Sequence, residues 1–360
     1  MKKAILIVLA IALVGIVFFK IYRVPVSNVF PIVTTITVTP TPIPTLPPLP
    51  TANIIENDYQ IFQTFNNCGP AALSMALSYY GINKSQLELG QELRPYQNPQ
   101  GNNDDKSVTL DELAKEAEKF NLLAYVRPHG NVKLLKTFIA QGIPVIIETT
   151  LTESDDIGHF RVVKGYDDTI GVIIQDDSMQ GHNIQFSQDV IDNMWKQYDY
   201  EYLVLVPKEK QQIAEAILGN DLNEKIAWQE AAAVNQQSLV INPNDVNSRF
   251  NFSVALYHLG SYQESVSEFE KIENKLPFRT LWYQIEPIEA YFALENYQRV
   301  FALTDEILNN GNRAFSELYI IRGKIYQKQG NMQAARAEFE KAVFYNVNMQ
   351  LAQQLLQSAQ

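Results

Sequence analysis

The chain has 360 residues, of which 46% are hydrophobic and 19% are charged, and its net charge at pH 7 is −11. This length exceeds what one ordinary hydrophobic core accommodates and predicts two folded domains. The acidic balance argues against nucleic acid as a main partner, because neutralising phosphates requires clustered Lys and Arg.

An uninterrupted apolar run from Ala4 to Phe19 follows two lysines at the start of the chain. As a helix it would be roughly 24 Å long, and continuation to Tyr22 brings it close to the ~30 Å hydrocarbon core of a membrane. We predict a signal anchor over residues 1–23, which makes this a single-pass protein of the cell membrane with its bulk extracytoplasmic. The alternative is a cleaved secretory signal and a secreted protein, although no small-residue cleavage site follows the run.

Residues 24–53 are rich in Pro and Thr. Proline removes backbone donors and favours an extended polyproline II conformation, so this segment need not form a core. We interpret it as a semi-rigid linker between the anchor and the first domain.

Residues 54–208 mix helical and strand patterns. Helical patterns cover residues 67–81, 109–121, 131–142 and 186–198, and strand patterns cover 122–128, 143–149, 159–166, 171–176 and 202–207. The second helix opens on a capping box from Thr109 to Glu112, and four turn residues between the third and fourth strands indicate a hairpin. Because helices come first and an antiparallel sheet follows, we predict an α+β domain.

Residues 209–360 are helical by pattern and contain an internal repeat. Tyr262, Tyr297 and Met332 occupy the same place in three copies that are 35 residues apart. A unit of this length is a helix pair that buries its apolar face only by stacking on its neighbours. The segment resembles tetratricopeptide repeats (TPR), which implies an all-α helical solenoid with a surface for a protein partner. The residues that carry the resemblance are Gly260, Tyr262, Phe269 and Pro277, whereas Glu295 stands where the second copy should have Gly.

Cys68 is the only cysteine of the chain and stands where the first helix of the α+β domain begins. By itself such a residue is either an inert buried thiol or a reactive one. A helix N-terminus stabilises a thiolate through unpaired N–H groups and the helix dipole, and the thiolate is the nucleophilic form. The position therefore favours a reactive cysteine if a base lies nearby.

Of the four histidines, His159 is the best candidate for that base, because it begins a predicted strand. The next strand ends on Asp176 and Asp177, and a hairpin can bring that end back beside His159, where a carboxylate would orient the imidazole. His129 and His182 fall in predicted turns or loops, and His258 falls in the repeats.

Three sequence blocks, "NNCGPAALSMALSYYG", "GHFRVVKGYDD" and "IIQDD", resemble the motifs of papain-like cysteine peptidases of family 39, which process bacteriocin leaders. The resemblance covers about residues 54 to 207. It implies a papain-like fold with Cys68 as nucleophile, His159 as base and Gln63 as oxyanion donor. Asn66 and Asn67 are alternative amide donors for the oxyanion. The resemblance also implies Asp176 as the orienting acid, with Asp177 as an open alternative.

Together with the predicted anchor, the two resemblances indicate a membrane-anchored, extracytoplasmic cysteine peptidase that cleaves a peptide or protein by acyl transfer, with TPR repeats that recruit substrate or partner. Two alternatives stay open, namely an inactive papain-like/TPR binding scaffold and a cysteine acyltransferase on the same fold. We expect no metal and no cofactor, because the histidines lack ligand spacing and one cysteine cannot form a zinc cage.

Overall fold

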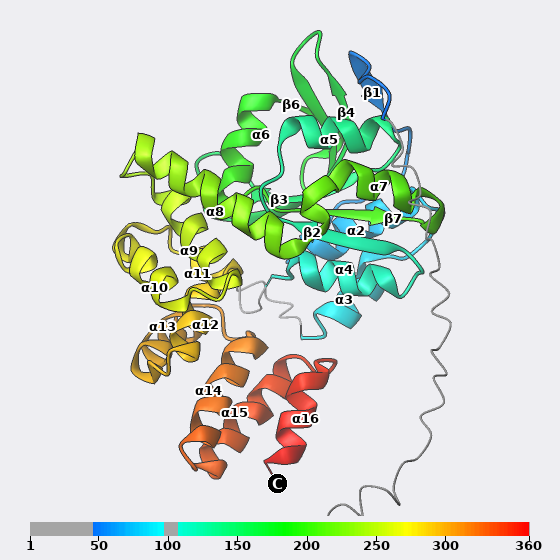
Figure 1. Ribbon diagram of the computed structural model, residues 1–360. Coiled ribbons are helices and arrows are strands. Elements are labelled where there is room, and N and C mark those ends of the chain that lie inside the picture. Colours follow the sequence, from blue (N-terminus) through cyan, green and yellow to red (C-terminus); the bar gives the residue numbers. More distant parts are fainter. Residues whose placement is uncertain (1–45, 97–106, 360) are drawn as a thin grey trace, which may run out of the picture. The chain divides into compact units, whose positions relative to one another are not determined.

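The computed structural model describes residues 46–96 and 107–359 (Figure 1). The predicted anchor at residues 1–23, and the predicted linker as far as residue 45, lie outside the described residues. Among the residues that are described, no helix is both long and apolar enough to cross a membrane.

The first domain is α+β, as predicted, with an antiparallel sheet. Its strands are β1 (Ala52–Ile54), β2 (Leu123–Arg127), β3 (Val145–Thr150), β4 (Gly158–Asp167), β5 (Val172–Asp177), β6 (Gly181–Ser187) and β7 (Tyr202–Val206). Its helices are α2 (Cys68–Ser78), α3 (Gln86–Leu93), α4 (Leu110–Glu118), α5 (Val132–Ala140), α6 (Gln188–Trp195) and α7 (Gln211–Leu218).

The sheet has the strand order β2-β7-β3-β4-β5-β6, and β1 pairs with β4 outside this path. Successive side chains of a strand point to opposite faces, so one strand contributes to two cores. Val162 of β4 packs with α2, α3 and α4, whereas the next residue, Val163, packs with α5, α6 and α7. Helices therefore cover both faces of the sheet.

Two strands were not predicted. Residues 181–187 were interpreted partly as a loop around His182, but they form β6 at the edge of the sheet. Their sequence, GHNIQFS, is largely polar, and an edge strand buries too little to require an apolar run. Ala52 and Asn53, assigned to the linker, belong to β1.

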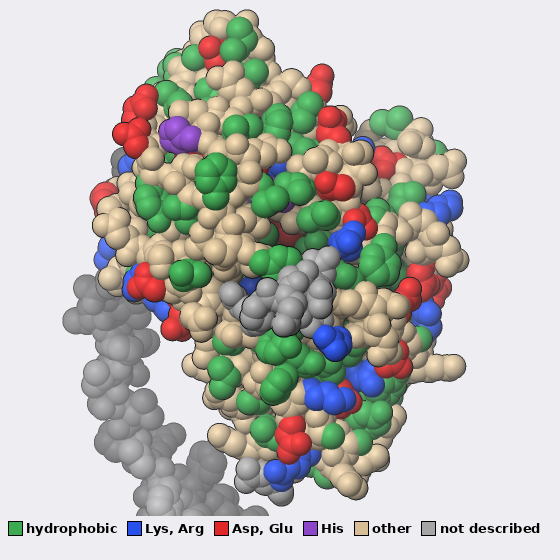
Figure 2. Space-filling model, turned by 180° about the vertical axis from the view of Figure 1, so that it is seen from behind, with side chains coloured by type: hydrophobic (Ala, Val, Ile, Leu, Met, Phe, Trp, Pro, Cys, Tyr) green, Lys and Arg blue, Asp and Glu red, His purple; other side chains and the backbone are tan. Residues whose placement is uncertain are grey.

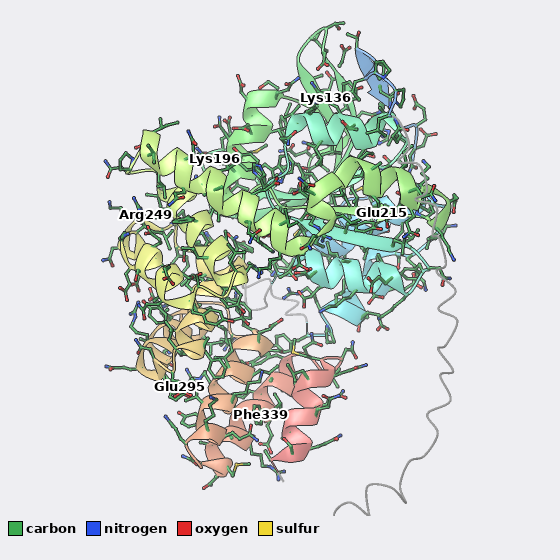
Figure 3. The ribbon with its side chains drawn as sticks, in the orientation of Figure 1. Lys136, Lys196, Glu215, Arg249, Glu295 and Phe339 are labelled. Atoms are coloured by element: carbon green, nitrogen blue, oxygen red, sulfur yellow. The ribbon has the colours of Figure 1, made fainter. Side chains whose placement is uncertain are left out.

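The second region is helical and contains the predicted repeats. Its helices are α8 (Glu224–Ile241), α9 (Val246–His258), α10 (Tyr262–Glu270), α11 (Thr280–Tyr283), α12 (Glu286–Ala293), α13 (Tyr297–Asn309), α14 (Ser316–Lys328), α15 (Met332–Tyr345) and α16 (Gln350–Ser358). Gly260, Glu295 and Gly330 have positive φ angles of 79°, 57° and 76° at the turn of the three pairs. Glu295 thus adopts the left-handed turn despite its side chain (Figure 3).

The first helix of the second repeat is broken. The 35-residue spacing aligns α9 with residues 281–293, yet this stretch is divided between α11 and α12. Pro287 stands in the first turn of α12 and has no N–H to donate to the carbonyl of Tyr283, and its ring excludes a continuous helix there. The break gives α11 a direction of its own.

Acidic and basic side chains are interspersed with hydrophobic ones on the face shown in Figure 2.

Candidate active site

Cys68 is the first residue of α2, and it is 7% exposed. The preceding residue, Asn67, places no side-chain hydrogen bond on the helix end, so the first N–H groups of α2 stay uncapped. A Cβ on Gly69 would lie 2.1 Å from Val108 Cγ2. Close packing against Val108 therefore requires glycine at position 69.

Cys68 and His159 line one cavity of about 100 Å³, and Gln63 lines it too. The structure thus brings together three of the four predicted site residues, from a loop, a helix start and a strand. Within the described part of the chain, no hydrogen bond joins Cys68 to His159.

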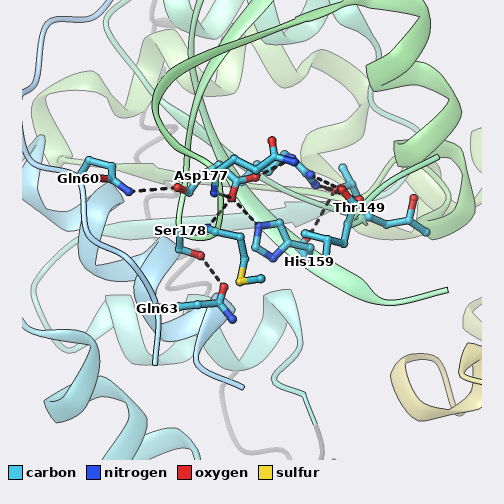
Figure 4. A network of polar contacts seen from close by, with 11 residues as sticks. Gln60, Gln63, Thr149, His159, Asp177 and Ser178 are labelled. Carbon is cyan, nitrogen blue, oxygen red and sulfur yellow. Dashed lines mark hydrogen bonds and ion pairs between the residues drawn. The ribbon is translucent and has the colours of Figure 1, made fainter. Parts of the chain in front are cut away.

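The imidazole of His159 is held by a buried carboxylate. Its Nε2 lies 3.0 Å from Asp177 Oδ1, which also accepts the Met179 N–H at 2.7 Å (Figure 4). The other Asp177 oxygen, Oδ2, forms an ion pair with Arg161 Nε at 3.1 Å. Because Nε2 interacts with Asp177, Nδ1 is the ring nitrogen that can hydrogen-bond to a group in the cavity.

The prediction that Asp176 faces His159 is wrong, because Asp177 does so. Asp177 lies opposite Arg161 in the β4–β5 ladder, on the side shared with His159, while Asp176 lies opposite Val162 and points to the other face. Asp176 instead contacts Lys164 Nζ at 3.1 Å and His182 Nδ1 at 2.8 Å.

A β-bulge explains the exchange of the two carboxylates. The ladder pairs Asp167 with Val172, and an uninterrupted register from there would place Asp176 opposite Val163, on the side of His159. The register shifts between Val163 and Gly165, and one extra residue turns every later side chain to the other face.

Gln63 is fixed to the segment that carries the acid. Its backbone N–H donates to Ser178 O at 2.9 Å, and Ser178 Oγ donates to Gln63 Oε1 at 2.7 Å (Figure 4). Gln60 Nε2 donates to Asp177 O at 3.1 Å. Gln63 lines the cavity, and with Oε1 accepting from Ser178 its Nε2 is the donor atom of the side chain.

The pKa values of the site do not favour the thiolate form of Cys68 that the sequence analysis expected. Burial, followed by the carboxylate of Glu148, raises the pKa of the Cys68 thiol to about 11. Burial also lowers the pKa of the His159 imidazole, although Asp177 opposes this shift. The resting site therefore holds a neutral thiol and a neutral imidazole at pH 7.

Asp177 stays ionised. Burial raises its pKa, but the hydrogen bond and charge of His159, the charge of Arg161 and the Met179 N–H outweigh burial and lower the pKa to about 2. A carboxylate that is charged at every physiological pH can stabilise the imidazolium once it forms.

The repeat region contributes four residues to the cavity, which the sequence analysis did not identify. They are Arg279, Trp282, Tyr283 and Asn312. No local motif marks them, because they lie more than a hundred positions after His159.

The remaining histidines have structural surroundings. His182 binds Asp176, His129 takes a φ of 61° in a turn, and His258 stacks on Trp228 with ring centroids 3.8 Å apart. In residues 46–96 and 107–359, no three His, Cys, Asp or Glu side chains are grouped so that they could hold a metal ion.

Cys68 thus begins a helix that packs on an antiparallel sheet, and His159 and Asp177 lie on neighbouring strands of that sheet. Residues 53–203 match the Peptidase C39 like family, and residues 316–343 match the tetratricopeptide repeat. The chain therefore carries a Peptidase C39-like domain followed by a TPR region, which confirms both resemblances.

Solved structures similar to each region are known. A C39-like peptidase from Bacillus anthracis is 18% identical, with a TM-score of 0.38, covering 44% of this chain and 98% of its own. The peptidase domain of Streptococcus ComA is 20% identical, with a TM-score of 0.33, covering 41% and 97%. A TPR protein from Thermus thermophilus is 18% identical, with a TM-score of 0.32, covering 39% and 79%. No curated protein sequence matches this chain.

Proposed function

We propose that the first domain is a cysteine peptidase in which Cys68 is the nucleophile, His159 the general base and Asp177 the residue that orients His159. Gln63 is the oxyanion donor. The observation that carries this proposal is that the chain's one cysteine, at the uncapped start of a buried helix, shares a cavity with an imidazole held by a buried aspartate.

The neutral resting pair sets the order of steps. When a peptide enters, Nδ1 of His159 takes the thiol proton, and Asp177 stabilises the imidazolium that forms. The sulfur adds to the scissile carbonyl, whose oxygen gains negative charge and accepts from Gln63 Nε2 and the Cys68 N–H. His159 then protonates the leaving amine, and a water activated by the neutral imidazole releases the acyl group from Cys68.

One observation favours a second candidate, the inactive binding scaffold. The raised pKa of the Cys68 thiol leaves very little thiolate at pH 7 before a ligand binds. In that case the cavity would bind a peptide without cleaving it. Transfer of the acyl group to an acceptor other than water uses the same residues and differs only in the product.

Incubation of the full-length protein with a peptide library, followed by mass spectrometry, separates these functions. A peptidase produces new termini in the wild type and none in Cys68→Ala, whereas an acyltransferase produces peptides joined to a new acceptor. Binding without any new product, equal in the wild type and Cys68→Ala, would establish the scaffold instead.

We also propose that residues 1–23 anchor the protein in the cell membrane with both domains extracytoplasmic, and that the repeats recruit a protein partner or substrate. The apolar run and its preceding lysines support the anchor. Digestion of intact cells by an external protease tests it: loss of the folded domains supports the topology, and full protection contradicts it.

A further inference from the structure

Asn312, in the loop between α13 and α14, carries a buried acceptor without a partner. It is 1% exposed and lines the cavity of Cys68 and His159, and its Oδ1 accepts no hydrogen bond within the described structure. An acceptor that is buried without a hydrogen-bond partner destabilises the free protein. A ligand that donates an N–H to Asn312 removes that destabilisation.

The loop that contains Asn312 packs against α11, which forms one side of the cavity. Gly311 has a φ of 106°, and a Cβ there would lie 3.5 Å from Trp282 Cη2. Trp282 is 7% exposed and lines the same cavity. Gly311 therefore lies against the indole, and Asn312 and Trp282 line the same cavity.

An ion pair and aromatic contacts hold α11 against the loop that precedes His159. Arg279 Nη1 donates to Asp156 Oδ1 at 2.6 Å, and the Arg279 N–H donates to Asp156 Oδ2 at 3.1 Å. Tyr283 meets Tyr198 edge to face, and a Cβ on Gly158 would lie 2.8 Å from the Tyr283 ring. The break before Pro287 separates α11 from α12.

The cavity presents complementary partners for a peptide bond. Gln63 Nε2 is a donor, Asn312 Oδ1 is an acceptor, and the surrounding Leu151, Ile157, Met179, Trp282 and Tyr283 are apolar or aromatic. The positive charge of Arg279 is paired with Asp156. Among the lining residues that the structure describes, none carries an unpaired charge that would compensate a charged substrate side chain.

We propose that the repeat region forms part of the peptide-binding site. In this site, Asn312 accepts a hydrogen bond from a backbone N–H of the substrate. The α11 residues that line the cavity contact an uncharged side chain next to the scissile bond. The inference rests on the proposed peptidase function and adds the substrate class, a peptide with an uncharged residue at that position.

Reaction of Cys68 with peptide chloromethyl ketones tests the proposal, because label can enter only one cysteine. The probes are an acetylated alanine tripeptide chloromethyl ketone and its analogues methylated in turn at each backbone N. In the wild type, we expect one analogue to react about tenfold more slowly than the parent, because it cannot donate to Asn312. In Asn312→Leu that difference disappears.

Asn310→Leu is the matched control, because Asn310 is exposed two residues earlier and should keep the wild-type ratio. Ratios that are the same in the wild type and Asn312→Leu for every analogue overturn the inference. So does failure of all peptide probes to label a wild-type protein that iodoacetamide labels. Replacing the alanine next to the ketone by Lys or Glu should slow labelling at least tenfold, and equal rates refute the uncharged-residue assignment.

The peptidase function fails by a different result. If iodoacetamide and the parent probe both label the wild type and His159→Ala at equal rates, His159 does not activate Cys68. In that case the ratio of labelling rates between the parent probe and its N-methylated analogues can still be measured. Failure of the proposed peptidase function is therefore distinguishable from failure of the inference about Asn312.

Discussion

Replacing Asp177 by Asn should impair catalysis and stability together. Asn keeps the shape but loses the charge that faces His159 and Arg161. The pKa of Asp177 is lowered from 3.8 to about 2, and each pKa unit corresponds to ~1.4 kcal/mol. Part of this shift comes from the charge of protonated His159, and His159 is neutral at pH 7, so ionised Asp177 contributes at most about 2.5 kcal/mol to the folded state at that pH.

The sign of this contribution fixes its pH range. A carboxyl whose pKa is depressed on folding stabilises the protein above its unfolded pKa, and the gain is lost as pH falls through the folded pKa. The difference in unfolding free energy between the wild type and Asp177→Asn should be full above about pH 5 and should approach zero only below about pH 2. Urea unfolding at a series of pH values measures it.

The catalytic effect follows from the same carboxylate. A hydrogen bond to a charged group contributes about 1.5–3 kcal/mol, so loss of Asp177 should slow peptide-probe labelling of Cys68 by roughly tenfold to a hundredfold. Asp176→Asn is the matched control. It removes a buried partner of Lys164 and His182 and should destabilise the fold while leaving labelling of the folded protein within about threefold. Slowed labelling in Asp176→Asn with normal labelling in Asp177→Asn would refute the assignment.

Three further substitutions test the surroundings of the site. Glu148→Gln should lower the pKa of the Cys68 thiol, because that carboxylate helps to raise it, and an unchanged midpoint in the pH profile of iodoacetamide labelling would contradict this. Burial raises the pKa of Asp199 from 3.8 to about 7, so the folded state loses stability as pH rises from the first value to the second. Asp199→Asn should raise the unfolding free energy at pH 8 by at most about 4 kcal/mol and leave it nearly unchanged at about pH 3, whereas an equal gain at both pH values would contradict the cause. Gly69→Ala should destabilise the protein by about 1–3 kcal/mol in denaturant unfolding, and Val108→Ala should restore part of the loss; no rescue would show that Val108 is not the obstacle.

The elements that the sequence predicted are those with strong local signals. The helix at Cys68, the β4–β5 hairpin and the 35-residue repeat all rest on periodicity or turn residues within one segment. The position of the turn at Glu295 was predicted from the repeat spacing alone, although the usual glycine is missing.

The parts that the sequence did not predict depend on register and on distant contacts. The bulge between Val163 and Gly165 places Asp177 instead of Asp176 on the side of His159, and no residue type in the hairpin predicts this bulge. Asn312 and Trp282 reach the cavity only because the second region packs on the first. The neutral state of Cys68 depends on burial and on Glu148, which a helix-start pattern does not reveal.

The most direct measurement of the central claim is the rate at which a peptide chloromethyl ketone labels Cys68 in the wild type, His159→Ala and His182→Ala at pH 7. If His159 takes the thiol proton, labelling slows at least tenfold in His159→Ala and stays near the wild-type rate in His182→Ala. Equal rates in the wild type and His159→Ala would contradict the account.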